Sequence, residues 1–306
     1  MTELQDSSNA PDEAQAASPG KGLRKLLDLL DLETLEVNLF RGRSPQEDRQ
    51  RVFGGQVLAQ ALTAACRTVD QERAAHSFHA YFLRAGDPSI PIVYQVDRIR
   101  DGRSFATRRI VAIQHGHAIF NMSASFQVEE PSDSHQLEMP QVEAPEELPD
   151  DEDLAARFRD SAPADWQEEG GWFDADRPIE QRYADPINWW SPERQDGYQR
   201  VWLRTRGRMP DAPELHTIVL AYASDMSLLD VATMPNGLSY FDDGMQIASL
   251  DHAMWFHRSF RADEWLLYVS DSPSSSNSRG FARGNIFDRS GRLVASVVQE
   301  GLMRKR

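Results

Sequence analysis

The same sequence pattern occurs twice along the chain, and this duplication constrains the fold more than any other feature. The segment AYFLRAGDP in the first half resembles MWFHRSFRA in the second, and SFATRR resembles RGFARG. Corresponding residues stand at a nearly constant offset in three places: Arg84 and Arg258 (174), Phe105 and Phe281 (176), and Gly116 and Gly291 (175). Three matches in the same order indicate a duplicated half-chain.

Each half is predicted to contain one long buried helix and several strands. Apolar residues at helical spacing predict helices over 52–69 and 214–232, and small residues such as Ala61 and Ala65 let the first lie close to a sheet. A shorter helix from residue 22 and a strand over 35–43 come before them. Alternating apolar residues, separated by turn signals, predict the remaining strands: 76–84, 91–99, 104–115 and 117–128, then 197–207, 246–257, 264–270, 278–287 and 291–303.

The acidity of the chain is concentrated between the halves. Between Glu129 and Asp176 there are 17 acidic and two basic residues, so this segment accounts for the whole formal net charge of −15. Such a charge block predicts a solvated surface linker. The predicted organisation is a disordered tail (1–21), a first repeat (22–130), an acidic linker (131–179) and a second repeat (180–306).

Composition excludes several other classes of protein. One cysteine, Cys66, rules out a disulfide framework and favours a reducing compartment, and no signal-peptide pattern opens the chain, so we expect a cytoplasmic protein. No apolar run is long enough to insert into a membrane. His76 and His79, three residues apart in a predicted strand, point to opposite faces and make a poor metal pair. We expect no metal, no cofactor and no nucleic-acid partner.

Longer motifs resemble one known family, in the same order along both halves. They are LFRGRSPQEDRQRVFGGQVLAQAL, HSFHAYFLRAGDPSIPIVYQVDRIRDGRSFATRRI, YASDMSLL, IASLDHAMWFHR and LVASVVQEGLMR. Together they resemble the bacterial acyl-CoA thioesterase II family over roughly residues 22–130 and 180–304. The resemblance implies an α+β double hotdog fold, two tandem repeats each with an antiparallel sheet wrapped around a long central helix. It also implies hydrolysis of fatty acyl-CoA to free fatty acid and CoA.

The resemblance places the active site in the second repeat. In that family an Asp, a Thr or Ser, and a Gln hold a water for attack on the thioester, and these positions fall on Asp225, Ser249 and Gln299. A carboxylate next to apolar residues has a raised pKa and can act as a general base. Ser and Gln offer donors and acceptors that orient a water without ionising. Aligned through the turn glycines, Gln299 falls opposite Ala124, so the two repeats differ at this position.

Three further residues are weaker candidates. Gln56 begins the first long helix and is predicted to line a vestigial site in the first repeat. Arg279 and Arg283 flank a Ser- and Gly-rich loop, and arginines in such loops bind phosphates, so both are candidate contacts for the phosphates of CoA.

Two alternatives remain beside the hydrolase. Hotdog enoyl-CoA hydratases typically carry an Asp and a His five residues apart on the helix, whereas five residues after Asp225 this chain has Asp230. A non-catalytic acyl-CoA-binding protein would be favoured by loss of a site residue, and all three are present. The resemblance also implies a homo-oligomer.

Overall fold

The computed structural model describes residues 19–45, 50–159, 177–185 and 193–306. The first repeat consists of one short helix, one long helix and six strands: α1 (Lys21–Leu30), β1 (Glu33–Glu36), β2 (Leu39–Gly42), α2 (Gly54–Cys66), β3 (Arg73–Phe82), β4 (Ile92–Asp101), β5 (Phe105–Gln114) and β6 (His117–Val128). The second repeat follows the same plan with added short elements: β7 (Ile179–Tyr183), β8 (Tyr198–Thr205), α5 (Pro213–Ser224), α6 (Asp230–Thr233), the 3₁₀ turn η2 (Met234–Asn236), β9 (Met245–Ser249), β10 (Asp251–Phe256), β11 (Leu266–Ser276), β12 (Arg279–Asp288) and β13 (Leu293–Lys305).

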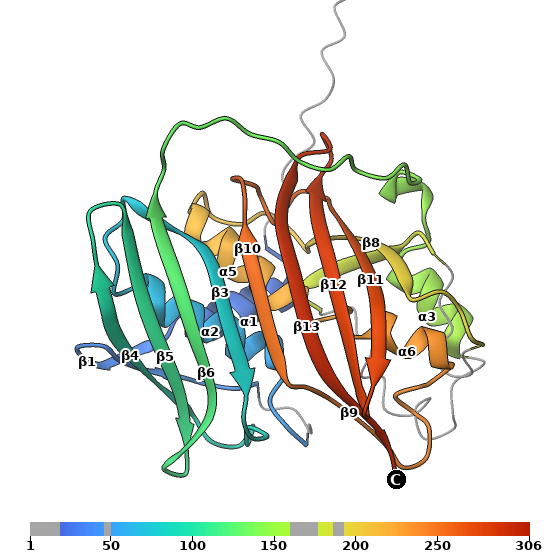
Figure 1. Cartoon of the computed structure of the whole chain (residues 1–306), viewed down its shortest axis with the longest axis horizontal. Helices are drawn as coiled ribbons and strands as arrows, with labels where there is room; N and C mark the ends of the chain where they lie inside the picture. The colour runs from blue at the N-terminus through green and yellow to red at the C-terminus, as the bar shows by residue number, and fades with distance from the viewer. Residues whose placement is uncertain (1–18, 46–49, 160–176, 186–192) are drawn as a thin grey trace, which may run out of the picture.

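The strands form one 13-stranded antiparallel sheet whose order repeats itself (Figure 1). Reading outward from the centre, one half runs β3-β6-β5-β4-β2 and the other β10-β13-β12-β11-β8. The halves join where β3 pairs with β10, with Phe78 opposite Met254. Each of these five strands of one half thus has a counterpart in the other, which confirms the predicted duplication and the double hotdog fold.

The two long helices lie side by side on one side of the sheet (Figure 1). Most of α2 is fully buried, including Ala59, Ala61, Ala64 and Ala65, and these small side chains allow the close approach that the sequence predicted. The two helices come very close at the first turn of α2, where a Cβ on Gly55 would lie 2.4 Å from the Tyr222 carbonyl oxygen of α5. This close approach brings the start of α2 to the end of α5.

The two predicted turn glycines have the backbone conformation that requires glycine. Gly116 joins β5 to β6 with φ +74°, and Gly291 joins β12 to β13 with φ +85°. These values lie in the left-handed region, where a Cβ is strained. Each hairpin therefore places its glycine where φ is positive, although the first loop has two residues and the second has three.

Three predicted elements are interrupted in the structure. The helix predicted over 214–232 ends at Ser224 and resumes only as the short α6, because Asp225 turns the chain at the helix end. The strand predicted over 246–257 is divided into β9 and β10, which both pair with β13. The strand predicted over 35–43 is a hairpin of β1 and β2, with Asn38 at φ 61°.

The acidic connection is only partly solvated. Its residues 131–159 include η1 (Pro145–Glu147) and α3 (Asp151–Arg159), and they run over the outer face of the second half of the sheet. Met139, Val142 and Leu148 pack against a cluster of buried residues on that face: Trp202, Trp265, Leu267, Phe287 and Leu293. The prediction of a purely solvated linker is therefore wrong for this part, because its scattered apolar side chains cover two tryptophans. Residues 160–176 of the predicted linker and 1–18 of the predicted tail lie outside the described residues.

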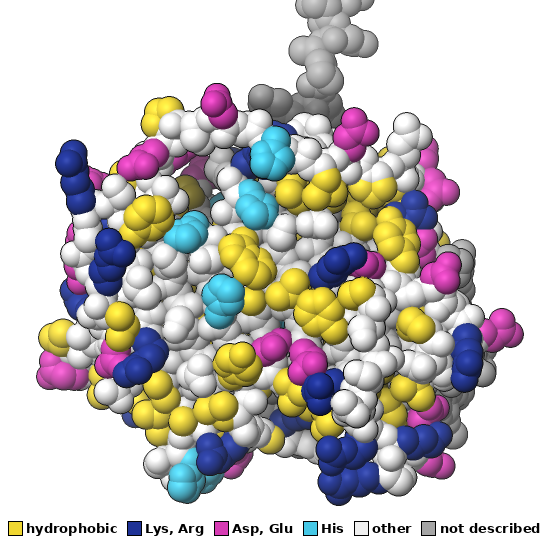
Figure 2. Space-filling view, viewed as in Figure 1, with side chains coloured by type: hydrophobic (Ala, Val, Ile, Leu, Met, Phe, Trp, Pro, Cys, Tyr) yellow, Lys and Arg dark blue, Asp and Glu magenta, His cyan; other side chains and the backbone are white. Residues whose placement is uncertain are grey.

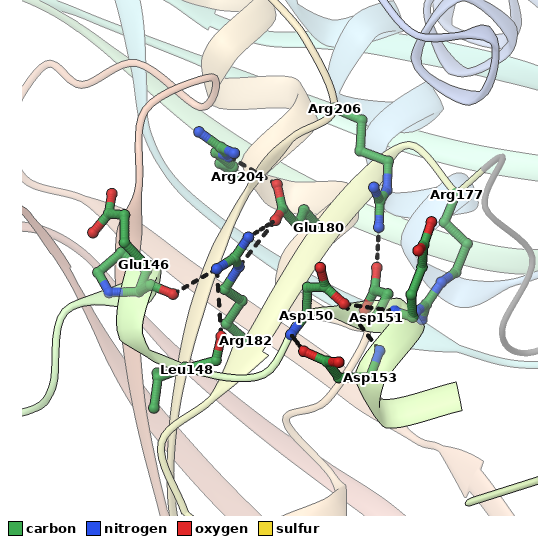
Figure 3. Close-up of polar contacts among 12 residues, drawn as sticks. Glu146, Leu148, Asp150, Asp151, Asp153, Arg177, Glu180, Arg182, Arg204 and Arg206 are labelled. Atoms are coloured by element: carbon green, nitrogen blue, oxygen red, sulfur yellow. Dashed lines mark hydrogen bonds and ion pairs between the residues drawn. The ribbon is translucent and has the colours of Figure 1, made fainter. Parts of the chain in front are cut away.

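Ion pairs hold this connection in place (Figure 3). Asp151, at the start of α3, pairs with Arg206 and, at 2.9 Å, with Arg177. Arg182 donates to the Pro145 carbonyl oxygen at 2.8 Å and pairs with Glu180 at 2.9 Å. Acidic residues of the connection thus meet arginines of the neighbouring sheet edge, which explains why a block of negative charge stays close to the folded repeat.

The outer face of the sheet carries apolar and histidine side chains over its central strands (Figure 2). Tyr81 and Leu83 are 57% and 46% exposed, and His79 contacts Trp255 edge to face at 5.1 Å between ring centroids. Within the described part of the chain, no helix is both long enough and apolar enough to span a bilayer.

Candidate active site

Asp225 lies at the meeting point of the two long helices. It caps the carboxyl end of α5 instead of lying within a helix as the sequence predicted, and its side chain is only 5% exposed. Its carboxylate accepts a hydrogen bond from the Gly55 N–H at the start of α2. Phe53 provides no side-chain cap for α2, so Asp225 supplies the negative charge that a helix N-terminus favours.

Gly54 makes room for this carboxylate. A Cβ at Gly54 would lie 2.6 Å from Asp225 Oδ2 and 3.1 Å from the ring of Phe82. Glycine is therefore required here by close approach. The site is built from both repeats, since the acid belongs to the second and the helix start to the first.

Ser249 and Gln299 complete the cluster from two adjacent strands. Ser249 ends β9 and pairs with Gly301 of β13, two residues beyond Gln299. Gln299 Nε2 donates to Asp225 Oδ1 at 2.7 Å and to Ser249 Oγ at 2.8 Å, and Ser249 Oγ lies 3.5 Å from the same carboxylate oxygen. The structure thus brings together all three residues that the family resemblance singled out.

The hydrogen bonds fix the orientation of the Gln299 amide. A carboxylate can only accept, so the amide atom beside Asp225 is the nitrogen, and Oε1 points the other way. Gln299 is 1% exposed, and its Oε1 has no hydrogen-bond partner among the described residues. A buried acceptor without a partner is uncommon and costly. It leaves one hydrogen-bond acceptor of the cluster unused.

Burial sets the electrostatics of this cluster. Removal from solvent raises the pKa of Asp225 to about 6, against opposing effects of the hydrogen bonds from Gln299, Gly55 and Ser249 and the charge of Arg51. Arg51 itself donates to the Ile247 carbonyl oxygen at 2.7 Å. A carboxyl with this pKa can both accept and return a proton near neutral pH.

His252 lies next to the acid, and the sequence analysis did not select it. Its imidazole is fully buried, Nε2 lies 2.9 Å from Ser224 Oγ, and Nδ1 lies 3.7 Å from Asp225 Oδ1. The sequence carried one signal that could have found it: His252 is a titratable residue three positions after Ser249, within the same predicted strand.

The weaker sequence candidates lie apart from this cluster. Gln56 is 3% exposed, and its Nε2 donates to the Arg43 carbonyl oxygen at 3.1 Å and to Ser44 Oγ at 3.2 Å, so it fastens the preceding loop to α2. Arg279 and Arg283 alternate along β12 with Gly280 and Ala282, which face the interior as Gln299 does. Both arginines therefore lie on the outer face of the sheet.

Each of these arginines has an acidic partner on that face. Arg279 Nε donates to Glu300 at 2.8 Å, and Arg283 Nε donates to Asp271 at 2.8 Å. Paired in this way and turned away from Asp225, they give no support to the predicted contacts with CoA phosphates. Among the described residues, no group of three His, Cys, Asp or Glu side chains is arranged to hold a metal ion.

The fold and the cluster together define a class: a double hotdog protein with a buried carboxylate, hydroxyl and amide at the junction of its repeats. Comparisons with known proteins narrow this class. A model of the acyl-CoA thioesterase family matches residues 170–302, and a model of the acyl-CoA thioesterase N-terminal domain matches residues 43–127. The chain therefore belongs to the acyl-CoA thioesterase II family and is a thioester hydrolase by class.

Individual relatives agree with these matches over nearly their whole length. The chain is 38% identical over 282 residues to acyl-CoA thioesterase 2 of Haemophilus influenzae, which covers 92% of this chain and 98% of that protein. It is 40% identical over 314 residues to acyl-coenzyme A thioesterase 8 of Rattus norvegicus, with 100% and 98% covered. The solved structure of acyl-CoA thioesterase II TesB2 from Mycobacterium marinum has a TM-score of 0.74 at 42% identity, with 92% and 98% covered.

A more distant structure supports the fold alone. A conserved protein of unknown function with the hot dog fold, from Alicyclobacillus acidocaldarius, has a TM-score of 0.72 at 20% identity and covers 92% of this chain.

Proposed function

We propose that the protein hydrolyses fatty acyl-CoA by direct attack of a water held by Asp225, Ser249 and Gln299. The observation that carries this proposal is the cluster itself: Gln299 Nε2 donates to both Asp225 and Ser249, and burial raises the pKa of the Asp225 carboxyl to about 6. A water that donates a hydrogen to the Asp225 carboxylate is placed to lose that proton to it. Its oxygen lone pair is then free to attack.

The reaction balances with these groups alone. The water oxygen bonds to the thioester carbonyl carbon while one of its protons passes to Asp225. The carbonyl oxygen becomes an oxyanion, and the first N–H groups of α2, which have no partner within the helix, are suitable donors for it. When the carbon–sulfur bond breaks, the CoA sulfur leaves with the proton held by Asp225, and the fatty acid is released.

Ser249 and Gln299 act on orientation in this scheme. Gln299 Nε2 joins the carboxylate to Ser249 Oγ, so Asp225 Oδ1 is fixed by two side chains from different strands. No covalent intermediate on the protein is needed. This agrees with the burial of Cys66, which raises the pKa of its thiol to about 12 and leaves it without thiolate character.

The test is thiol release from acyl-CoAs of increasing chain length, from acetyl to palmitoyl, with wild type and Asp225→Asn compared side by side. We expect hydrolysis by wild type and a loss of about a thousandfold or more in kcat for the variant, which keeps the volume of Asp225 and one acceptor oxygen but cannot take a proton. Asp230→Asn is the matched control, because Asp230 is a nearby acid that does not contact Ser249 or Gln299.

The same panel distinguishes the alternatives. No thiol release at any chain length, with retained binding, would leave a non-catalytic acyl-CoA-binding protein. Loss of the enoyl absorbance of crotonyl-CoA without thiol release would instead indicate an enoyl-CoA hydratase. An Asp225→Asn enzyme as fast as wild type would remove Asp225 from the mechanism.

The proposal also includes the oligomeric state of the protein and its location in the cell. The apolar outer face of the central strands favours self-association, so we expect a homo-oligomer, which sedimentation of the purified protein measures. The single cysteine favours a cytoplasmic location, which fractionation of the producing cell would test.

A further inference from the structure

The buried histidine beside Asp225 is not used by the proposed mechanism. His252 is fully buried in β10, and its ring stacks on Phe78 with 6.0 Å between centroids. Its Nδ1 has no hydrogen-bond partner and lies 3.7 Å from Asp225 Oδ1, just beyond hydrogen-bond distance. A buried polar atom left open beside the reacting carboxylate calls for a physical explanation.

The contacts of Ser224 determine where the imidazole proton lies. Ser224 Oγ donates its single hydrogen to the Ala221 carbonyl oxygen at 2.9 Å, since a carbonyl can only accept. His252 Nε2, 2.9 Å from the same Oγ, must therefore carry the imidazole hydrogen and donate it. Nδ1 is then an unprotonated acceptor that faces Asp225.

The duplication supplies an internal comparison. In the first repeat Phe78 of β3 pairs with Ala124 of β6, and both are buried and apolar. In the second repeat β10 and β13 pair in the same way, with Ala253 opposite Val298. The same register, continued by one residue, places His252 opposite Gln299. Both polar residues appear together, in the repeat that holds the acid, at positions where the other repeat has Phe and Ala.

The surroundings of His252 disfavour a charged imidazole. Burial lowers the pKa of His252 to about 3. The groups around the pair are Asp225 and Ser224 at the end of α5, Tyr268 of β11, whose hydroxyl donates to the Ser224 carbonyl oxygen, and the more distant cation Arg51. Asp225 is thus the acid that faces His252, and the neutral imidazole does not form an ion pair with it.

We propose that His252 is a positioning residue whose Nδ1 accepts a hydrogen bond from Asp225 Oδ1 once that carboxylate has taken the proton of the attacking water. The 3.7 Å separation closes to hydrogen-bond length by a shift of about 1 Å. The imidazole then stabilises the protonated acid for the short time before the proton passes to the CoA sulfur. This inference rests on the proposed role of Asp225 as the base.

The first test is the tautomer of His252, measured from the nitrogen-15 chemical shifts of the folded wild-type protein. We expect the form protonated at Nε2 and not at Nδ1, unchanged over about pH 5 to 8, because the imidazole stays neutral. A hydrogen on Nδ1, or an imidazolium in this range, would overturn the proposal. This measurement needs no variant and is independent of whether substitutions at a buried position fold.

The second test compares two amides of different length. His252→Asn places its amide oxygen near the position of Nδ1, whereas His252→Gln reaches the position of Nε2 and leaves the side facing Asp225 without an acceptor. We expect kcat of the Asn variant to exceed that of the Gln variant by about tenfold, the value of one hydrogen bond, with KM equal in both. On the acid side of the pH profile, the activity of the Gln variant should also fall at a lower pH than that of the Asn variant.

The outcomes separate this inference from the proposed function. Equal kcat values for the two variants and wild type, with Asp225→Asn inactive, would reject the role of His252 and keep Asp225 as the base. An active Asp225→Asn enzyme would reject the base itself. Thermal unfolding of each variant shows how much of it is folded, because loss of folded protein would also lower the apparent kcat at unchanged KM. Such a loss would not move the pH at which the activity falls.

Discussion

The Asp225 carboxylate at the end of α5 accepts a hydrogen bond from the Gly55 N–H at the start of α2. The two helices belong to different repeats, so the acid of the second repeat is held by the helix of the first. A helix N-terminus stabilises a negative charge, while burial opposes it. In Asp225 burial has the larger effect, since the pKa is raised and not lowered. The acid is thereby suited to proton transfer near neutral pH.

This balance predicts that Asp225 destabilises the folded protein at neutral pH. Its folded pKa of about 6 lies above the ordinary value of 3.8, so the folded state binds the proton more tightly, and the stability of wild type falls as pH rises through this interval. Above about pH 6 the full cost is about 3 kcal/mol. We expect Asp225→Asn to be more stable than wild type at pH 8 by up to that amount, measured by urea unfolding.

The difference should disappear below about pH 3, where Asp225 is protonated in both the folded and the unfolded state. An Asn variant that is less stable than wild type at pH 8 would show that the hydrogen bond from Gly55 and the charge at the start of α2 outweigh burial.

The same pKa predicts how kcat/KM falls on the acid side of the pH profile, which is called the acid limb below. Because the base acts in its ionised form, kcat/KM should fall tenfold per pH unit below about pH 6. Burial also raises the pKa of Asp230, to about 7, so it is a second candidate for such a limb. The Asp230→Asn enzyme distinguishes them: a limb that persists belongs to Asp225, and one that vanishes belongs to Asp230.

The sequence predicted the architecture well because its information is local or repeated. The periodicity that defines β6 and α2 lies in contiguous residues, and the duplication reveals that the two halves of the sheet match. Asp225, Ser249 and Gln299 came from resemblance to a family. The three contacts among these residues link positions that are 24, 50 and 74 residues apart in the sequence. No local sequence pattern predicts contacts over such separations.

What the sequence did not predict depends on contacts between the repeats. The fit of Gly54 against Asp225 and the position of His252 beside it arise where α2, α5 and β10 meet, and hydrophobic periodicity carries no information on such meetings. The end of α5 at Ser224 was missed for a related reason: apolar residues continue through Leu228 and Leu229, which are buried although they lie outside the helix.

The position of Arg283 predicts that it does not bind substrate. It lies on the outer face of β12, paired with Asp271, whereas Gln299 faces the interior. We expect Arg283→Ala to leave the KM for acyl-CoA within about twofold of wild type, because an exposed ion pair contributes little. The same holds for Arg279→Ala. A KM raised more than about fivefold in either variant, with kcat unchanged, would restore the predicted contact with CoA phosphates.

The fit of Gly54 against Asp225 gives the sharpest structural prediction. An added Cβ would lie 2.6 Å from Asp225 Oδ2 and 3.1 Å from the Phe82 ring, so Gly54→Ala must displace the carboxylate or the start of α2. A misplacement of about 1 Å in a reacting group can cost about a hundredfold in rate, and we expect a loss of kcat of that order.

Gly116→Ala is the control, since its added Cβ meets nothing within 4 Å but is strained by the φ of +74°. We expect that substitution to cost about 1 kcal/mol of stability and leave kcat unchanged. Activity that followed stability equally in both variants would show that Gly54 serves only the fold. A Gly54→Ala protein with normal kcat would show that the Asp225 carboxylate tolerates displacement, and its close contact with α2 would then not be needed for hydrolysis.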